Sequence, residues 1–241
     1  SNVESQDNDG RLPIHYACEF GDLDKVMLLV ANGARLDVSD RDGRLPMHCA
    51  CKNGFNGHRV TSFLIKQGAK VDSPDDDGRL PIHYACEFGD LDEIMLLVGN
   101  GPKVGIPDKN GRLTMHYACK NRSNGHRITS YLIRRGAKVD SPDNDGRLPI
   151  HYSCEFGDLD EVMLLVANGA KMDIPDRNRR MPMHYACRNR FNGEKITSFL
   201  IRKGAKVDSR DHDGRLPIHY ACRFGDLDEV MLLVANGAKV N

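Results

Sequence analysis

The chain is poor in the features that mark membrane proteins and nucleic-acid-binding proteins. It contains no tryptophan, and aromatic residues make up only 6% of its 241 positions, so stacking platforms for bases are sparse. No apolar run approaches the roughly 18 residues of a membrane-spanning helix, and we expect no direct membrane insertion. Charge of one sign is not in excess, because 34 lysines and arginines balance 34 aspartates and glutamates. Without net charge there is no bulk field to recruit nucleic acid.

What the chain has in abundance is internal repetition. The steps between successive copies of the string LPIHYAC alternate between 33 and 35 residues, so the duplicated unit is a pair of repeats. The seven copies begin at Leu12, Leu45, Leu80, Leu113, Leu148, Met181 and Leu216. We call the shorter repeats type A (7–39, 75–107, 143–175 and 211–241) and the longer ones type B (40–74, 108–142 and 176–210). We expect all seven to form a single array over residues 1–241.

Each repeat predicts a tight turn followed by two helices. In the first repeat, the segment from Asp7 to Gly10 has the aspartate and glycine pattern of a turn. Pro13 stands where a helix begins without losing a backbone hydrogen bond, and apolar residues follow it at helical spacing. Asp22 is a suitable N-cap for a second helix, which Gly33 ends. The sequence therefore predicts an all-α fold of repeated helix pairs.

The recurring pattern D-x-x-G-x-x-P-x-H-x-A, followed by G-x-L and L-x-x-x-G-A, closely resembles the ankyrin repeat over residues 7–241. The resemblance implies a solenoid of stacked antiparallel helix pairs with short β-turn fingers. It also implies binding of other proteins through the fingers and the concave face formed by the inner helices. We accordingly expect a protein–protein interaction scaffold whose partner is unidentified and acidic in character, with no cofactor.

Three departures from the family pattern concern the starts of the first helices and the turns. The family usually has threonine before the proline, where its hydroxyl caps the helix and meets the motif histidine, but this chain has leucine or methionine. A missing cap costs about 1 kcal/mol, which leucine could offset by burying apolar area. The pattern leaves open what the histidines bond to instead. Thr114 replaces the proline of the fourth repeat, and Arg179 replaces the turn glycine of the sixth.

A histidine and a cysteine lie three residues apart in every repeat, as His15 and Cys18 do in the first. Zinc needs four ligands around one point, whereas each repeat offers two, and packed helices lie about 8–10 Å apart. That separation also exceeds the roughly 6.8 Å between Cα atoms that a disulfide allows. We therefore expect no metal site, and buried, reduced cysteines that indicate a cytoplasmic location. Because every polar motif recurs along the chain instead of forming one constellation, we expect no enzyme.

The first candidate binding site is a row of arginines, one directly after the turn glycine or its replacement in every repeat. Stacking of repeats would align their forked guanidinium groups along the groove, where they suit carboxylates or phosphates. The alternative is that each arginine pairs with a turn aspartate such as Asp9, Asp42, Asp77, Asp145 or Asp213 and supports its own finger. The arginine row consists of Arg11, Arg44, Arg79, Arg112, Arg147, Arg180 and Arg215.

The second candidate site lies at the ends of the first helices of the type B repeats. Lys52, Lys120 and Arg188 stand there, before a loop with two additional residues. Phe55 and Phe191 lie near the tip of this loop, where an apolar side chain is suited to anchor a partner. The alternative is that these two rings fold back into the core, onto Phe20, Phe88, Phe156 or Phe224.

Charge alternates along the array, because every type A repeat is acidic and every type B repeat is basic. One hypothesis is that the alternation fixes the order of neighbours during folding, with exposed pairs contributing about 0–1 kcal/mol each. A second is that the basic repeats bind nucleic acid or another polyanion, most strongly through residues 177–210. A third is a purely structural or elastic array.

Neither end of the chain resembles a capping repeat. Residues 2–7 resemble the KVDSPD segment that ends type B repeats, and the last repeat stops after an apolar second helix. We expect the chain to be a fragment of a longer array, with exposed terminal faces that favour end-to-end self-association.

Overall fold

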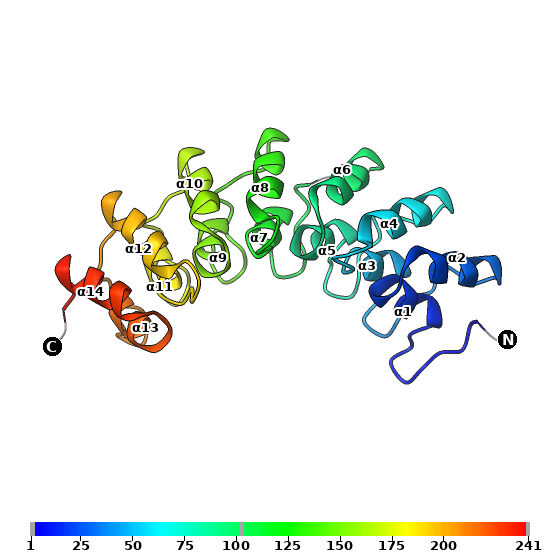
Figure 1. Ribbon diagram of the computed structural model, residues 1–241, viewed down its shortest axis with the longest axis horizontal. Helices are drawn as coiled ribbons and strands as arrows, with labels where there is room; N and C mark the ends of the chain where they lie inside the picture. The colour runs from blue at the N-terminus through cyan, green and yellow to red at the C-terminus, as the bar shows by residue number, and fades with distance from the viewer. Residues whose placement is uncertain (1–2, 102–103, 240–241) are drawn as a thin grey trace. The chain divides into compact units, whose positions relative to one another are not determined.

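The computed structural model describes residues 3–101 and 104–239, and within these ranges it contains fourteen α-helices and no β-strand (Figure 1). The all-α fold class expected from the sequence is confirmed. The chain divides into two compact units, Ser1–Tyr117 (the N-terminal unit) and Ala118–Asn241 (the C-terminal unit). Of the helices in the described ranges, none is long and apolar enough to cross a membrane.

Every repeat contributes two consecutive helices, which we call its first and second helix. In the C-terminal unit, Figure 1 shows the first helices α9, α11 and α13 in one row and the second helices in another. The type A repeats contain α1 (Pro13–Phe20) and α2 (Leu23–Ala31), α5 (Pro81–Phe88) and α6 (Leu91–Gly99), α9 (Pro149–Phe156) and α10 (Leu159–Ala167), and α13 (Pro217–Phe224) and α14 (Leu227–Ala235). The type B repeats contain α3 (Pro46–Ala50) and α4 (Gly57–Lys66), α7 (Thr114–Ala118) and α8 (Gly125–Arg134), and α11 (Pro182–Ala186) and α12 (Gly193–Arg202).

The helix ends follow the local sequence. Pro13 is the first residue of α1, and the N–H of Gly21, which ends this helix, donates to the carbonyl of Ala17 at 2.9 Å. The carboxylate of Asp22 then accepts the N–H of Lys25 at 3.1 Å, which satisfies one of the unpaired donors in the first turn of α2. The equivalent aspartates make the same bond at 2.9 Å in α6 (Asp90), α10 (Asp158) and α14 (Asp226).

The buried motif histidines take over the capping that threonine provides in the family pattern. His15 accepts the backbone N–H of Leu12 through Nδ1 at 3.0 Å and donates from Nε2 to the carbonyl of Arg44 in the next repeat at 3.2 Å. An imidazole that accepts at one nitrogen and donates at the other is neutral. Burial lowers the pKa of His15, and it lowers that of His151 to about 4. The rings of His15, His48 and His184 therefore both start a helix and tie one repeat to the next.

Two residues that depart from the family pattern, Thr114 and Arg179, differ in how well they fit their positions. Thr114, which replaces proline at the start of α7, is buried, and its hydroxyl donates to the carbonyl of Val104 at 2.6 Å. Arg179 adopts the left-handed backbone conformation of the turn glycines, with φ of 59°. It is the one residue other than glycine with positive φ in the described ranges, and its Cβ makes this conformation costly.

Replacing Arg179 with glycine is expected to stabilise the C-terminal unit by about 1 kcal/mol, because glycine adopts positive φ without steric penalty. Denaturant unfolding of the wild type and the variant measures the difference. Gly146→Ala is the matched control, since Gly146 occupies the same turn position one repeat earlier with φ of 75°. The control should lose a similar amount, and equal stability of all three proteins would contradict the explanation.

The interface between a type A repeat and the type B repeat that follows it is polar at the end of the first helices. The buried side chain of Asn53 donates to the carbonyls of Cys18 and Gly21 at 3.1 and 3.0 Å. Lys52 pairs with Glu19 across the same interface at 2.6 Å. In the C-terminal unit, Asn189 makes the equivalent bonds, and Arg188 pairs with Glu155 at 2.9 Å. The two ion pairs place an acidic side chain of a type A repeat against a basic side chain of the type B repeat that follows it.

The interface between a type B repeat and the type A repeat that follows it depends on a buried glutamate that sequence reasoning overlooked. The hydroxyl of Thr61 in α4 donates to the carboxyl of Glu93 in α6 at 2.7 Å, and Glu93 is only 1% exposed. Gly57 makes room for it, because a Cβ at that position would lie 2.8 Å from a Glu93 carboxyl oxygen. The C-terminal unit repeats the bond between Thr129 and Glu161 at 2.8 Å and between Thr197 and Glu229 at 2.7 Å.

Arg188→Glu is expected to destabilise the C-terminal unit by about 1 kcal/mol, because it places a second carboxylate beside Glu155. The loss should shrink at 1 M salt, where the Debye length is only about 3 Å. Thermal melts at low and high salt measure it. Arg202→Glu is the control, since Arg202 is an exposed residue of α12 without an ion pair among the described residues. Equal losses in the two variants would show that the pair across the interface is not the cause.

Candidate functional site

The arginine row lies at the bases of the fingers, two residues before each first helix begins. The guanidinium groups of Arg11, Arg79 and Arg147 lie over tyrosine rings of the first helices. Arg11 is 4.3 Å from the centre of the Tyr16 ring, and Arg79 is 5.3 Å from that of Tyr84. Such contacts between cations and aromatic rings hold the planar guanidinium in a fixed orientation. The tyrosines thereby set the direction in which the row presents its donors.

Carboxylates of the turns pair with members of the arginine row in two ways. Within one finger, Arg44 pairs with both Asp40 and Asp42, Arg79 with Asp77, and Arg215 with Asp213. Between neighbouring fingers, the nitrogen–oxygen distances are 3.8–4.0 Å for Arg11 with Asp40, Arg147 with Asp176, and Arg180 with Asp211. Arg112 is held at its backbone, where its N–H donates to Asp108 at 2.7 Å. The side chains stay partly accessible, from 13% exposed in Arg11 to 52% in Arg215.

The first aspartate of each turn is buried from the second repeat onward and organises the finger. One oxygen of Asp75 accepts the N–H groups of Asp77 and Arg79 at 2.9 and 2.8 Å, and the other accepts the hydroxyl of Tyr84 at 2.6 Å. Burial and this hydrogen bond raise the pKa of Tyr84 well above its ordinary value. Only the second repeat lacks the tyrosine, because Cys49 stands there.

In the second repeat, arginines replace the missing tyrosine hydroxyl. The Nε of Arg44 donates to the free oxygen of Asp40 at 3.0 Å, and Arg11 lies 3.6 Å from the Cys49 sulfur. Burial raises the pKa of Cys49 to about 11, so the thiol is neutral at physiological pH. Cys49 is buried, in agreement with the burial expected for the cysteines.

The basic residues at the ends of the type B first helices lie against the preceding type A repeat. Lys52 and Arg11 both bond to Glu19, and although burial opposes it, these bonds hold the pKa of Glu19 below its ordinary value. Arg188 pairs with Glu155, and Lys120 occupies the corresponding position two residues after the end of α7. Lys52 and Arg188 therefore belong to the interface between repeats, although their side chains are still partly exposed at the surface.

The two loop phenylalanines point away from the core. Phe55 is fully exposed at 101%, and Phe191 is 77% exposed. Neither ring has folded back into the core. The guanidinium of Arg122 lies 5.5 Å from the centre of the Phe191 ring. Large apolar side chains this exposed are suited to contact a partner.

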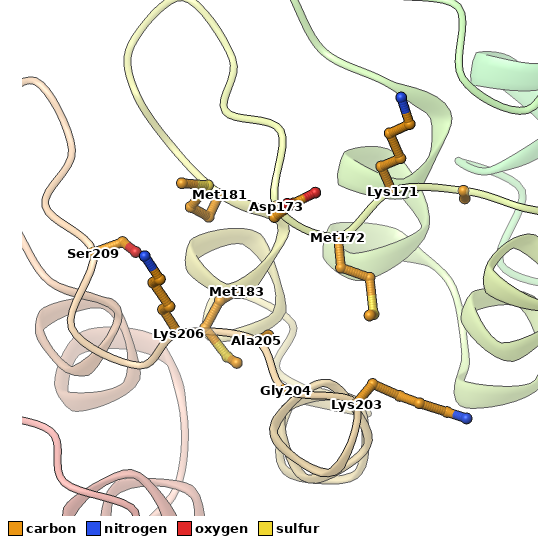
Figure 2. A pocket seen from close by; sticks show the side chains of 11 residues that line it. Lys171, Met172, Asp173, Met181, Met183, Lys203, Gly204, Ala205, Lys206 and Ser209 are labelled. Atoms are coloured by element: carbon orange, nitrogen blue, oxygen red, sulfur yellow. The ribbon is translucent and has the colours of Figure 1, made fainter.

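A hollow of about 490 Å³ opens where a type A repeat meets the next type B repeat in the C-terminal unit (Figure 2). Figure 2 shows Met172 and Met183 projecting toward its middle, while the ammonium groups of Lys171 and Lys203 point away from it. A corresponding hollow of about 590 Å³ lies in the N-terminal unit, where Leu36 occupies the place of Met172. The hollow thus arises from the way type A and type B repeats stack.

The cysteines are free thiols, and seven of the eight are buried. The expectation that all of them are buried is wrong for Cys222, which is exposed because no later repeat in the described part of the chain covers that face of α13. Within residues 3–101 and 104–239, no group of three or more histidine, cysteine, aspartate or glutamate side chains is arranged to hold a metal ion.

A family model described as ankyrin repeats (3 copies) matches five overlapping segments, residues 1–75, 55–143, 82–176, 122–211 and 150–241. Together these segments cover the whole chain. A search of curated proteins found no match.

Proposed function

The chain belongs to the ankyrin repeat family, whose members generally mediate protein–protein interaction and are typically non-enzymatic, and from this premise we propose that it is a non-enzymatic scaffold that binds an acidic protein partner along the arginine row. The observation that carries the proposal is the repetition of one oriented, partly accessible guanidinium per repeat. Arg147 illustrates it, with its guanidinium 5.8 and 5.0 Å from the ring centres of Tyr152 and Tyr185.

A repeated donor favours an extended partner over a small substrate. Successive arginines are separated by one repeat, and the fingers that carry them are joined by backbone hydrogen bonds, such as that from Arg177 to Asp145 at 2.9 Å. Carboxylates of a partner would compete with the finger aspartates for the forked donors, so each contact contributes a modest amount and the row acts additively. The cysteines, which are free thiols, support our proposal that the protein resides in a reducing compartment such as the cytoplasm.

The test is affinity capture from source-cell extract with the wild type and a variant that carries Arg79→Gln, Arg112→Gln, Arg147→Gln and Arg180→Gln. The matched control carries Arg59→Gln and Arg127→Gln, which remove exposed arginines from second helices instead. We expect one protein partner retained by the wild type and the control and lost by the row variant. Circular dichroism and melting confirm that the row variant is folded. A partner retained equally by all three would overturn the proposal.

A further inference from the structure

A second cluster of arginines and phenylalanines forms one edge of the C-terminal unit, away from the arginine row. Arg122 lies between two rings, 5.9 Å from the centre of Phe156 and 5.5 Å from that of Phe191. Arg190 and Arg223 both lie over Phe224, at 5.7 and 5.0 Å. We call these six residues the arginine–phenylalanine edge: Arg122, Phe156, Arg190, Phe191, Arg223 and Phe224.

The edge is separated from the arginine row by the length of a first helix. Arg147 precedes α9, whereas Phe156 is its last residue, and an eight-residue helix is about 12 Å long. The two surfaces therefore lie at opposite ends of the same helices. A partner held at the edge does not need to contact the fingers.

The cations of the edge are uncompensated. In the described part of the chain, the guanidinium groups of Arg122, Arg190 and Arg223 make no hydrogen bond and no ion pair, and their recorded contacts are with phenylalanine rings. The nearby carboxylates are engaged elsewhere. Asp158 and Asp226 cap α10 and α14, and Glu155 pairs with Arg188, which itself lies 5.9 Å from the Phe224 ring.

The N-terminal unit has the phenylalanines of this edge without the arginines. Gly54 stands where the later type B repeats have Arg122 and Arg190, and Glu19 and Glu87 stand where the last repeat has Arg223. Because Phe20 and Phe55 are still exposed there, the aromatic rings alone belong to the general repeat, and the stacked cations are particular to the C-terminal unit. A specific ligand of the edge should therefore be one that the cations recognise.

We propose that the arginine–phenylalanine edge is a second binding surface, which takes an acidic peptide segment that also carries apolar side chains. A guanidinium stacked on a ring keeps its forked donors in one plane, which suits the two oxygens of a carboxylate. The 77% exposed ring of Phe191, whose centre lies 5.5 Å from the guanidinium of Arg122, offers an apolar contact beside a cation. A partner that carries both carboxylate and apolar groups matches this pairing.

The test measures fluorescence anisotropy of a labelled peptide in which glutamates alternate with leucine and phenylalanine. The wild type is compared with a variant carrying Arg122→Gln, Arg190→Gln and Arg223→Gln, and with Phe191→Ala. We expect binding about tenfold weaker or worse in both, because central arginine and aromatic contacts usually dominate an interface. Phe55→Ala, which removes an exposed ring from the N-terminal unit, should bind as the wild type does.

Further ligands distinguish binding of a mixed acidic and apolar peptide from binding of other polyanions. A polyglutamate peptide of equal charge should bind more weakly than the mixed peptide, because it lacks apolar contacts. Tighter binding of single-stranded oligouridylate, with a steep salt dependence, would overturn the proposal in favour of nucleic acid. Unchanged peptide affinity in the triple variant would overturn it as well. The variant that lacks four row arginines should keep this affinity, so failure of the proposed function and failure of this inference are distinguishable.

Discussion

Raising the pH from about 6.5 to 9 is expected to destabilise the protein, and the buried glutamates are the reason. Burial raises the pKa of Glu93 and Glu161 to about 8 and that of Glu229 to about 7, against 4.5 for an ordinary glutamate. These carboxyls stay protonated in the folded state, while the unfolded chain releases their protons at lower pH. Stability from this source is present below pH 4.5 and is lost as the pH rises through 8.

The groups that face Glu161 account for the direction of the shift. Desolvation is the largest cause, and the charge of Asp158 at the start of the same helix adds to it, while the hydrogen bonds from Thr129 and Cys119 oppose it. The neutral histidines act in the other direction, because His151 has a pKa of about 4 and costs stability as the pH falls below 6.5. Among the groups with a shifted pKa, the glutamates are those that ionise in the folded protein between pH 6.5 and 8, so we assign the decline in stability in that window to them.

Two substitutions of Glu161 separate its hydrogen bond from its charge. Glu161→Gln keeps an acceptor for the Thr129 hydroxyl and cannot ionise, so it should match the wild type at pH 6 and exceed it at pH 9 by about 2–3 kcal/mol. Glu161→Ala leaves the hydroxyl unpaired beside a cavity and should lose about 2–3 kcal/mol at pH 6. Denaturant unfolding of each protein at both pH values measures these differences.

The control for this experiment is Asp160→Asn, which changes an exposed carboxylate of α10 that does not contribute to the shift of Glu161. Its stability should follow that of the wild type across the whole pH range. If Glu161→Gln also followed the wild type at pH 9, the carboxyl would be ionised in the folded protein and the explanation would fail.

Replacing His48 with alanine is expected to destabilise the N-terminal unit by about 2–4 kcal/mol. The ring accepts the N–H of Leu45 at 3.0 Å, donates to the carbonyl of Arg79 in the next repeat at 3.2 Å, and meets the Tyr84 ring edge-on with ring centres 5.8 Å apart. Its removal leaves two backbone groups unpaired and opens a cavity. His58→Ala, on the exposed surface of α4, is the matched control.

Thermal melts and denaturant unfolding of the two histidine variants measure the loss. The control should stay within about 0.5 kcal/mol of the wild type, as exposed substitutions usually do. A loss in His48→Ala no larger than in His58→Ala would mean that the histidine does not replace the threonine cap of the family.

Local sequence determined the repeat period, the helix pairs and their ends. Turn glycines, the proline that starts each first helix and N-caps such as Asp22 act over a few residues, so their effects are readable without knowing what packs above or below. The positions of the arginine row and of the loop phenylalanines also follow from the period. The conformation of Arg179 was implied by the glycine that it replaces.

Contacts between repeats could be decided only by the tertiary structure, because they join residues about one repeat apart whose burial depends on the neighbour. From the sequence, Glu161 is indistinguishable from the exposed acidic residues of its helix. Only the stacking of its repeat against Thr129 makes it a buried hydrogen-bond acceptor. Arg122 is a second example. The sequence indicates only a charged residue in a loop, and the tertiary structure places the rings of Phe156 and Phe191 beside its guanidinium. A periodic sequence fixes which residues recur, whereas desolvation and pairing are properties of the space between repeats.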